Sequence, residues 1–229
     1  MVVAQLHQEN KSDISTVNRH KIFVPLLLIL FLIWTLYRVL FSFPVWFDET
    51  IGKLIFFGLP VWMYVVVVQT RIIESTLKFA KLIPGLYLGL AIGGLYGFVG
   101  VLAMTAGKQE FTTVFLFFSA RFWWEFLLAL LTGFWESLFF FGWVFLVAEK
   151  RFIARWQLTG VLLFTALVFI LFHIPNTILR FPLASVLPQL FLLFFFAIGQ
   201  GLLFFRYRNI YAIALSHAIW GMVLLIYGS

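Results

Sequence analysis

Three titratable side chains lie within long apolar stretches of the sequence: Glu136, His173 and His217. The hydrocarbon core of a membrane has no water to solvate a charge, and an ionised side chain there costs at least about 2.5 kcal/mol. Three such groups on three separate helices are tolerated most easily where they meet in one polar pocket. We therefore predict that Glu136, His173 and His217 form a single catalytic site.

Two kinds of chemistry fit a glutamate with two histidines. In the first, the glutamate takes a proton from water, one histidine holds that water, and the other donates to the oxyanion formed when water attacks a carbonyl. The product is a hydrolysed peptide bond in or at the membrane. In the second, the three side chains bind zinc. The sequence contains no HExxH pair and no further acid deep in an apolar stretch, so we expect no cofactor and treat zinc as the less favoured alternative.

Each residue taken singly also has a simpler interpretation. Glu136 could hydrogen-bond two helices together, His173 could lie at a helix end near the outer interface, and His217 could be a hydrogen-bonded core histidine. Buried intramembrane acids are usually functional, which favours a functional site at Glu136.

The composition indicates a protein that is almost entirely membrane domain. Of 229 residues, 63% are hydrophobic and 11% are charged, and the mean hydropathy is +1.06. A soluble domain of this length could not bury so much apolar surface. There is no cysteine, which excludes disulfides, a thiol nucleophile and a cysteine zinc site. The net charge of +7 comes from short loops between apolar runs, so we expect membrane lipids and no nucleic acid as partners.

Apolar segments of spanning length predict an all-α polytopic membrane bundle of about seven transmembrane helices. The predicted spans are residues 22–41, 51–69, 84–104, 122–148, 157–173, 183–205 and 210–227. We expect Pro175 to end the fifth span at His173, which places that histidine nearer the outer face than Glu136. The small-residue spacing of Gly89, Gly93 and Gly94 in the third span would let a neighbouring helix approach closely.

The segments group into three regions. Residues 1–21 are predicted to be a cytosolic polar tail with His20 solvated, residues 22–121 to contain N-terminal transmembrane helices, and residues 122–229 to form a core with the candidate site. Residues 114–118 are apolar but too short to span.

The distribution of basic residues predicts the orientation. With the N-terminus inside, the cytosolic segments collect eleven of the sixteen lysines and arginines, and the other side holds Arg38, Lys53, Lys108, Arg121 and Arg180. This bias favours a cytoplasmic N-terminus, an outer C-terminus and a location in the plasma (inner) membrane.

The candidate residues lie in three short motifs. Glu136-Ser137-Leu138-Phe139-Phe140-Phe141-Gly142 resembles a Glu-Glu-x-x-x-Arg run followed by glycine, and Phe169 to His173 matches Phe-x-x-x-His. His217 to Gly221 falls at the place of a final His-x-x-x-Asn. In order, spacing and helix placement, the region from about 122 to 227 resembles the CPBP intramembrane protease family. That family includes CAAX prenyl endopeptidases and bacteriocin-processing or self-immunity proteins.

The resemblance implies a glutamate-dependent protease in which Glu136 and His173 activate water and His217 helps to form the oxyanion site. Three motif positions differ in this chain, because Ser137, Phe141 and Gly221 stand where the motif has Glu, Arg and Asn. A lost oxyanion donor can cost about 3–4 kcal/mol of barrier. Gln200 and Asn176 are candidates to replace it.

Three functions are compatible with these patterns. The favoured hypothesis is an intramembrane endopeptidase that uses a glutamate-activated water to cut a membrane-associated or lipidated peptide or protein. The alternative is a catalytically impaired CPBP-like membrane scaffold or self-immunity protein. A transporter or proton relay is the third, and it requires a continuous polar path across the membrane.

Overall fold

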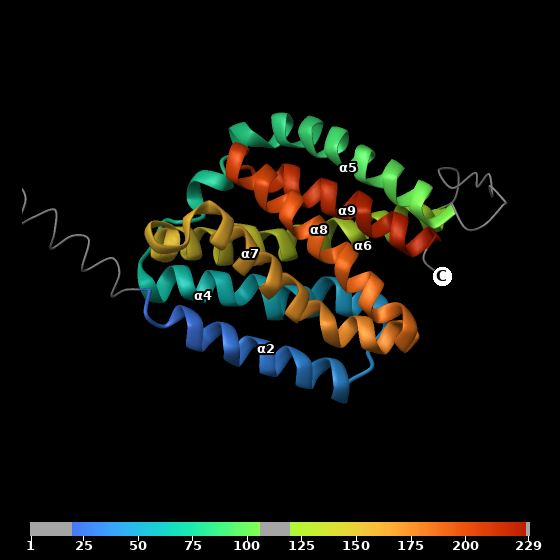
Figure 1. Ribbon diagram of the computed structural model, residues 1–229, viewed down its shortest axis with the longest axis horizontal. Helices are drawn as coiled ribbons and strands as arrows, with labels where there is room; N and C mark the ends of the chain where they lie inside the picture. The colour runs from blue at the N-terminus through green and yellow to red at the C-terminus, as the bar shows by residue number, and fades with distance from the viewer. Residues whose placement is uncertain (1–19, 106–119, 228–229) are drawn as a thin grey trace, which may run out of the picture.

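The computed structural model describes residues 20–105 and 120–227, and Figure 1 shows how the helices are arranged. Every regular element in these two ranges is a helix, which confirms the predicted all-α class. The elements are α2 (Phe23–Leu40), α3 (Val45–Phe47), η1 (Asp48–Gly52), η2 (Leu54–Gly58), α4 (Leu59–Val68), η3 (Glu74–Thr76), η4 (Phe79–Lys81), α5 (Leu82–Thr105), α6 (Ala120–Ser137), η6 (Leu138–Phe145), α7 (Leu146–Arg180), α8 (Leu183–Tyr207) and α9 (Ile210–Tyr227). Most of the predicted tail, up to residue 19, and the apolar piece at 114–118 lie outside the described ranges.

Among the described residues, five helices are long and apolar enough to cross a membrane, and α9 is a shorter apolar helix. The count of about seven spans stays a prediction. The fourth and fifth predicted spans fall together in one 61-residue helical stretch, residues 120–180. Inside that stretch, Gln157 has a left-handed φ of 55° and marks a kink between two helical arms.

The kink lets the chain turn back so that the two arms pack against each other, as the bend of α7 in Figure 1 shows. Phe140 and Phe169 have ring centroids 4.8 Å apart, and Phe139 and Phe172 have centroids 5.3 Å apart. These pairs run in opposite directions along the sequence, so the arms are antiparallel. All eight residues of η6 are buried, and η6 begins two residues after Glu136.

The expected stop at Pro175 is wrong. Helix α7 continues through Pro175 to Arg180, and the hydroxyl of Thr177 donates to the carbonyl of His173 in the adjoining turn. Membrane helices tolerate proline because neighbouring helices and Ser/Thr hydroxyls satisfy the local backbone groups. His173 therefore lies inside a helix rather than at its end.

Close backbone contacts hold α5, α6 and α9 together. An added Cβ at Gly89 would lie 2.8 Å from the carbonyl oxygen of Ala212, and one at Gly93 would lie 2.9 Å from Cα of Ser216. The predicted close approach is therefore present at these two glycines. Gly94 is different, because an added Cβ there would meet no described atom within 4 Å.

Helix α2 packs against α7 of the hairpin, and Figure 1 shows α2 and α5 along opposite edges of the bundle. Trp34 of α2 is buried and donates from Nε1 to the carbonyl oxygen of Phe172, at 2.8 Å. The expectation that His20 is solvated is wrong: its side chain is buried and hydrogen-bonded to Tyr64 of α4. A neutral imidazole can be buried among apolar side chains when it has a hydrogen-bond partner.

Candidate functional site

The structure brings Glu136, His173 and His217 together. Nε2 of His173 and Nε2 of His217 each lie 3.4 Å from Oε2 of Glu136. The side chains of Glu136, His217 and His173 are 3%, 10% and 17% exposed, so the three groups meet in a mostly buried corner. These distances are within the reach of one bridging water, although the catalytic role of the three residues stays a prediction.

Gly133 allows α9 to come close enough for this meeting. It lies one turn before Glu136, and a Cβ added to it would lie 2.7 Å from the carbonyl oxygen of Ala214. Ala214 in turn lies one turn before His217 on α9. The small residue therefore sets the spacing between the acid and the last histidine.

His173 is held by the preceding turn of its own helix. Its Nδ1 bonds the carbonyl oxygen of Phe169 at 2.7 Å, and its ring stacks on the Phe169 ring with centroids 4.1 Å apart. A carbonyl oxygen can only accept, so Nδ1 carries the proton. In the neutral ring, Nε2 then presents a lone pair toward Glu136, which suits it to accept a hydrogen bond from water.

His217 is buried between aromatic rings and has a free ring nitrogen. Its ring centroid lies 5.2 Å from that of Phe196 and 5.9 Å from that of Phe169. Its Nδ1 has no hydrogen-bond partner among the described residues. Because buried polar atoms normally have a hydrogen-bond partner, this nitrogen is available to bond a polar group of a bound substrate.

A fourth residue, Lys53, belongs to the site and was missed from the sequence. Its ammonium forms a buried ion pair with Oε1 of Glu136, and the residue is 4% exposed. The basic-residue pattern counts Lys53 only among the basic residues of the outer side and gives it no part in the site. The available signal was the missing arginine at Phe141, because a buried glutamate without its motif cation needs a positive charge from elsewhere.

The candidate replacements for the missing oxyanion donor have different surroundings. Gln200 is buried and exchanges hydrogen bonds of 2.9 and 3.0 Å with Ser216, so its amide is already engaged. Asn176 has a buried Oδ1 without a partner among the described residues. An added Cβ at Gly221 would meet no described atom within 4 Å, so no described side chain takes the place of the motif asparagine.

A second polar layer lies one turn from the site. Thr132 of α6 donates to Oε2 of Glu49 at 2.7 Å, and Arg180 of α7 pairs with Oε1 of Glu49 at 3.2 Å. The Arg180 side chain is 44% exposed, so this layer reaches the surface.

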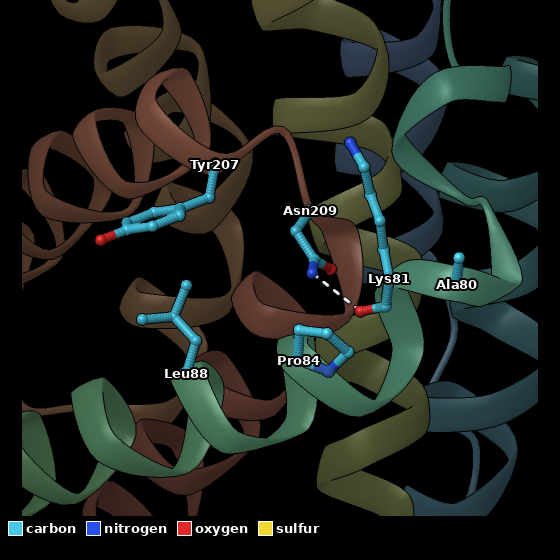
Figure 2. A pocket seen from close by; sticks show the side chains of 6 residues that line it. All are labelled: Ala80, Lys81, Pro84, Leu88, Tyr207 and Asn209. Atoms are coloured by element: carbon cyan, nitrogen blue, oxygen red, sulfur yellow. Dashed lines mark hydrogen bonds between the residues drawn. The ribbon is translucent and has the colours of Figure 1, made fainter.

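Two further features bear on the chemistry. Two histidines and a glutamate are a possible zinc set, yet no group of three or more such donors among the described residues has the arrangement to hold a metal ion. A cavity of about 330 Å³ lies at another place, lined by Ala80, Lys81, Pro84, Leu88, Tyr207 and Asn209. Figure 2 shows Asn209 in this cavity, donating to the carbonyl oxygen of Lys81 at 2.8 Å. None of the four site residues lines it, so the meeting of charged groups, rather than this cavity, marks the candidate site.

Comparison with known families agrees with the geometry. Residues 118–223 match the family model of the type II CAAX prenyl endopeptidase Rce1-like proteins. This match is consistent with a member of the CPBP family. The matched segment contains all three motifs, and it gives the chain the fold of a CAAX-type intramembrane protease in an integral membrane protein. No curated protein and no solved structure gives a significant match.

Proposed function

We propose that this CPBP protein is an intramembrane endopeptidase that hydrolyses a peptide bond with a water activated by Glu136. The observation that carries the proposal is the placement of two histidine nitrogens at 3.4 Å from one carboxylate oxygen, in a buried corner of a CAAX-protease fold. One oxygen of Glu136 is thus left for proton transfer while the other pairs with Lys53.

The reaction uses these groups in order. A water held between Oε2 of Glu136 and Nε2 of His173 gives its proton to the carboxylate, and its oxygen forms a bond to the peptide carbonyl carbon. The carbonyl π electrons move to oxygen, and an N–H of His217 donates to the resulting oxyanion. The oxyanion lone pair then re-forms the C=O bond as the C–N bond breaks, and Glu136 returns the proton to the leaving amine nitrogen.

The apolar surroundings support a lipidated or membrane-associated substrate. The exposed faces of the helices are apolar along their length, as at Leu32 of α2, Val66 of α4 and Leu167 of α7. A polypeptide that is lipidated or membrane-associated can reach the site within this apolar layer. We place the protein in the plasma membrane with its N-terminus in the cytoplasm, on the strength of the basic-residue bias.

A second function keeps support from two observations. Glu136 is almost fully buried, and Ser137, Phe141 and Gly221 differ from the family motif. Both features fit a CPBP-like scaffold or self-immunity protein that retains part of the site without cutting a substrate.

Cleavage of a farnesylated, internally quenched CAAX peptide in proteoliposomes separates the two. The wild-type protein should cleave the peptide, and Glu136→Gln should lose about 100-fold or more of the rate, since a general base contributes about 10²–10⁴-fold. Glu125→Gln is the matched control, because Glu125 lies on the same helix and pairs with Arg121 at the surface. Equal rates for wild type and Glu136→Gln, or no cleavage by the wild type, would favour the scaffold.

A further inference from the structure

Lys53 stands at the junction of two π-helical segments, η1 and η2, with its ammonium on Glu136. We propose that Lys53 is a positioning residue: it keeps Glu136 ionised and remains as the balancing cation when negative charge moves to the substrate oxygen. This inference rests on the proposed function, since it concerns the charge balance of the same hydrolysis.

Two aromatic rings hold the lysine in place. The Lys53 ammonium lies 5.2 Å from the ring centroid of Trp34 and 5.1 Å from that of Phe57. A cation over a ring face is attracted by the ring quadrupole, more strongly when water is absent. Trp34 is itself fixed by its hydrogen bond to the carbonyl of Phe172, the residue before His173. The contacts that fix the cation are therefore tied to the helix turn that carries His173.

The neighbouring acids have cations of their own. Asp48 pairs with Arg38 at 2.6 Å, and Glu49 pairs with Arg180 at 3.2 Å. Among the described residues, the ion pair of Lys53 is with Glu136 alone. Lys53 therefore pairs with the candidate base Glu136 and not with Glu49 of the second polar layer.

The position of the motif arginine cannot supply this charge. Phe141 is fully buried, and its ring packs 6.4 Å from Phe169 and 6.3 Å from Phe204, centroid to centroid. In the family motif the positive charge follows the glutamate by five residues. In this chain it comes from Lys53, which precedes Glu136 by 83 residues. Both ends of this pair lie beside π-helical turns, which occur frequently at functional sites.

The charge balance explains why the cation stays useful through the reaction. Before reaction, the site holds one positive ammonium and one negative carboxylate. After the water proton reaches Glu136, the carboxyl is neutral and the negative charge is on the carbonyl oxygen of the substrate. An unpaired charge in a buried site is costly. The fixed ammonium therefore stabilises the negative charge both while it is on Glu136 and after it has moved to the substrate oxygen.

The test compares Lys53→Met, Lys53→Arg and the control Lys78→Met in proteoliposomes with the farnesylated quenched peptide. We expect Lys53→Met to lower kcat by about 100-fold or more with little change in KM, as for other lost electrostatic contacts in the transition state. Lys53→Arg should recover most of the lost kcat because it keeps the charge. Lys78→Met makes the same change at an exposed loop lysine and should match the wild type.

Stability provides a readout that does not depend on cleavage. Thermal unfolding in detergent should show Lys53→Met to be less stable than the double variant Lys53→Met/Glu136→Gln, because removal of both charges leaves no orphan. A double variant that is no more stable than Lys53→Met would overturn the pairing.

The remaining outcomes separate the two proposals. Unchanged or raised kcat in Lys53→Met, beside an inactive Glu136→Gln, overturns the role of Lys53 and leaves the protease intact. Loss of kcat that Lys53→Arg fails to restore, with both variants folded, also overturns the role of charge. Full activity in Glu136→Gln removes the proposed function itself.

Discussion

Two acid–base pairs on the same helical stretch differ in how they use the carboxylate. Glu149 is held by Arg208, whose two terminal nitrogens each bond a different carboxylate oxygen, at 2.5 and 2.6 Å. Glu136 gives one oxygen to Lys53 and presents the other to two histidines. Both oxygens of Glu149 are thus engaged by its cation, whereas Glu136 keeps one oxygen free of its cation and available for proton transfer.

The two ion pairs also differ in how far their side chains are exposed to solvent. The Glu149 and Arg208 side chains are 19% and 30% exposed, and those of Glu136 and Lys53 are 3% and 6% exposed. The first pair joins the α7 arm to the end of α8, where water screens it. The second lies where electrostatic interactions are strong and an unpaired charge is costly. The comparison indicates that one pair is structural and the other is suited to chemistry.

The same acid-to-amide change at both sites should give the largest contrast. Glu136→Gln should abolish peptide cleavage because it removes the base, while Glu149→Gln should leave the rate close to wild type and lower the unfolding temperature. Parallel cleavage and thermal-unfolding measurements on the two variants check this. Equal loss of cleavage in both would contradict the division between them.

A change in helix spacing should weaken the site without touching its polar groups. In Gly133→Ala the new methyl group would press on the carbonyl of Ala214, and overpacking of this kind costs about 1–3 kcal/mol. The shift of α9 would move His217 away from Glu136, so cleavage should fall along with stability. Gly94→Ala, which adds the same methyl group where no described atom lies within 4 Å, is the control and should leave cleavage unchanged without lowering stability.

The arginine fork should matter only for stability. In Arg208→Lys the paired contact becomes a single one, and for a partly exposed pair we expect a loss of about 0.5 kcal/mol or less. Thermal unfolding measures the change, and the cleavage rate should stay that of the wild type. A fall in cleavage larger than the fall in stability would show that this pair also serves the site.

The smallest expected effect concerns His20, which lies before the first span. Burial, with Lys150 and Arg151 nearby, lowers the pKa of His20 below its usual 6.5, so the folded state favours the neutral ring. The unfolded chain then binds more protons, and stability should fall as pH drops below about 6.5. Unfolding measured from pH 7.5 to 5.5 should show this slope, and His20→Gln should reduce it. An unchanged slope in the variant would assign the pH dependence to other groups.

Much of the fold and the meeting of three residues could be predicted from the sequence. An acid and two histidines in apolar runs had few places to go other than toward one another, because lipid offers them no partners. The approach of α9 to Gly89 and Gly93 was likewise indicated by residue size.

Lys53 and Pro175 could not be placed in the same way. A lysine near the start of an apolar run extends to the headgroups in most membrane helices, and only the position of a second helix shows that it turns inward. The passage of α7 through Pro175 depends on Thr177 and on neighbouring helices, which are tertiary contacts. The position of Lys53 depends on Glu136, which is distant in sequence, and the helix at Pro175 depends on Thr177 and on neighbouring helices.

The order of the four site residues along the chain has a consequence for biosynthesis. Lys53 comes 83 residues before Glu136, and both histidines come after it. As the ribosome releases the chain, the carboxylate therefore enters the bilayer when its counter-ion is already there. The two histidines arrive later, and His217 arrives last. A nascent chain that stalls before its final helix thus holds a neutralised acid without the full set of site residues.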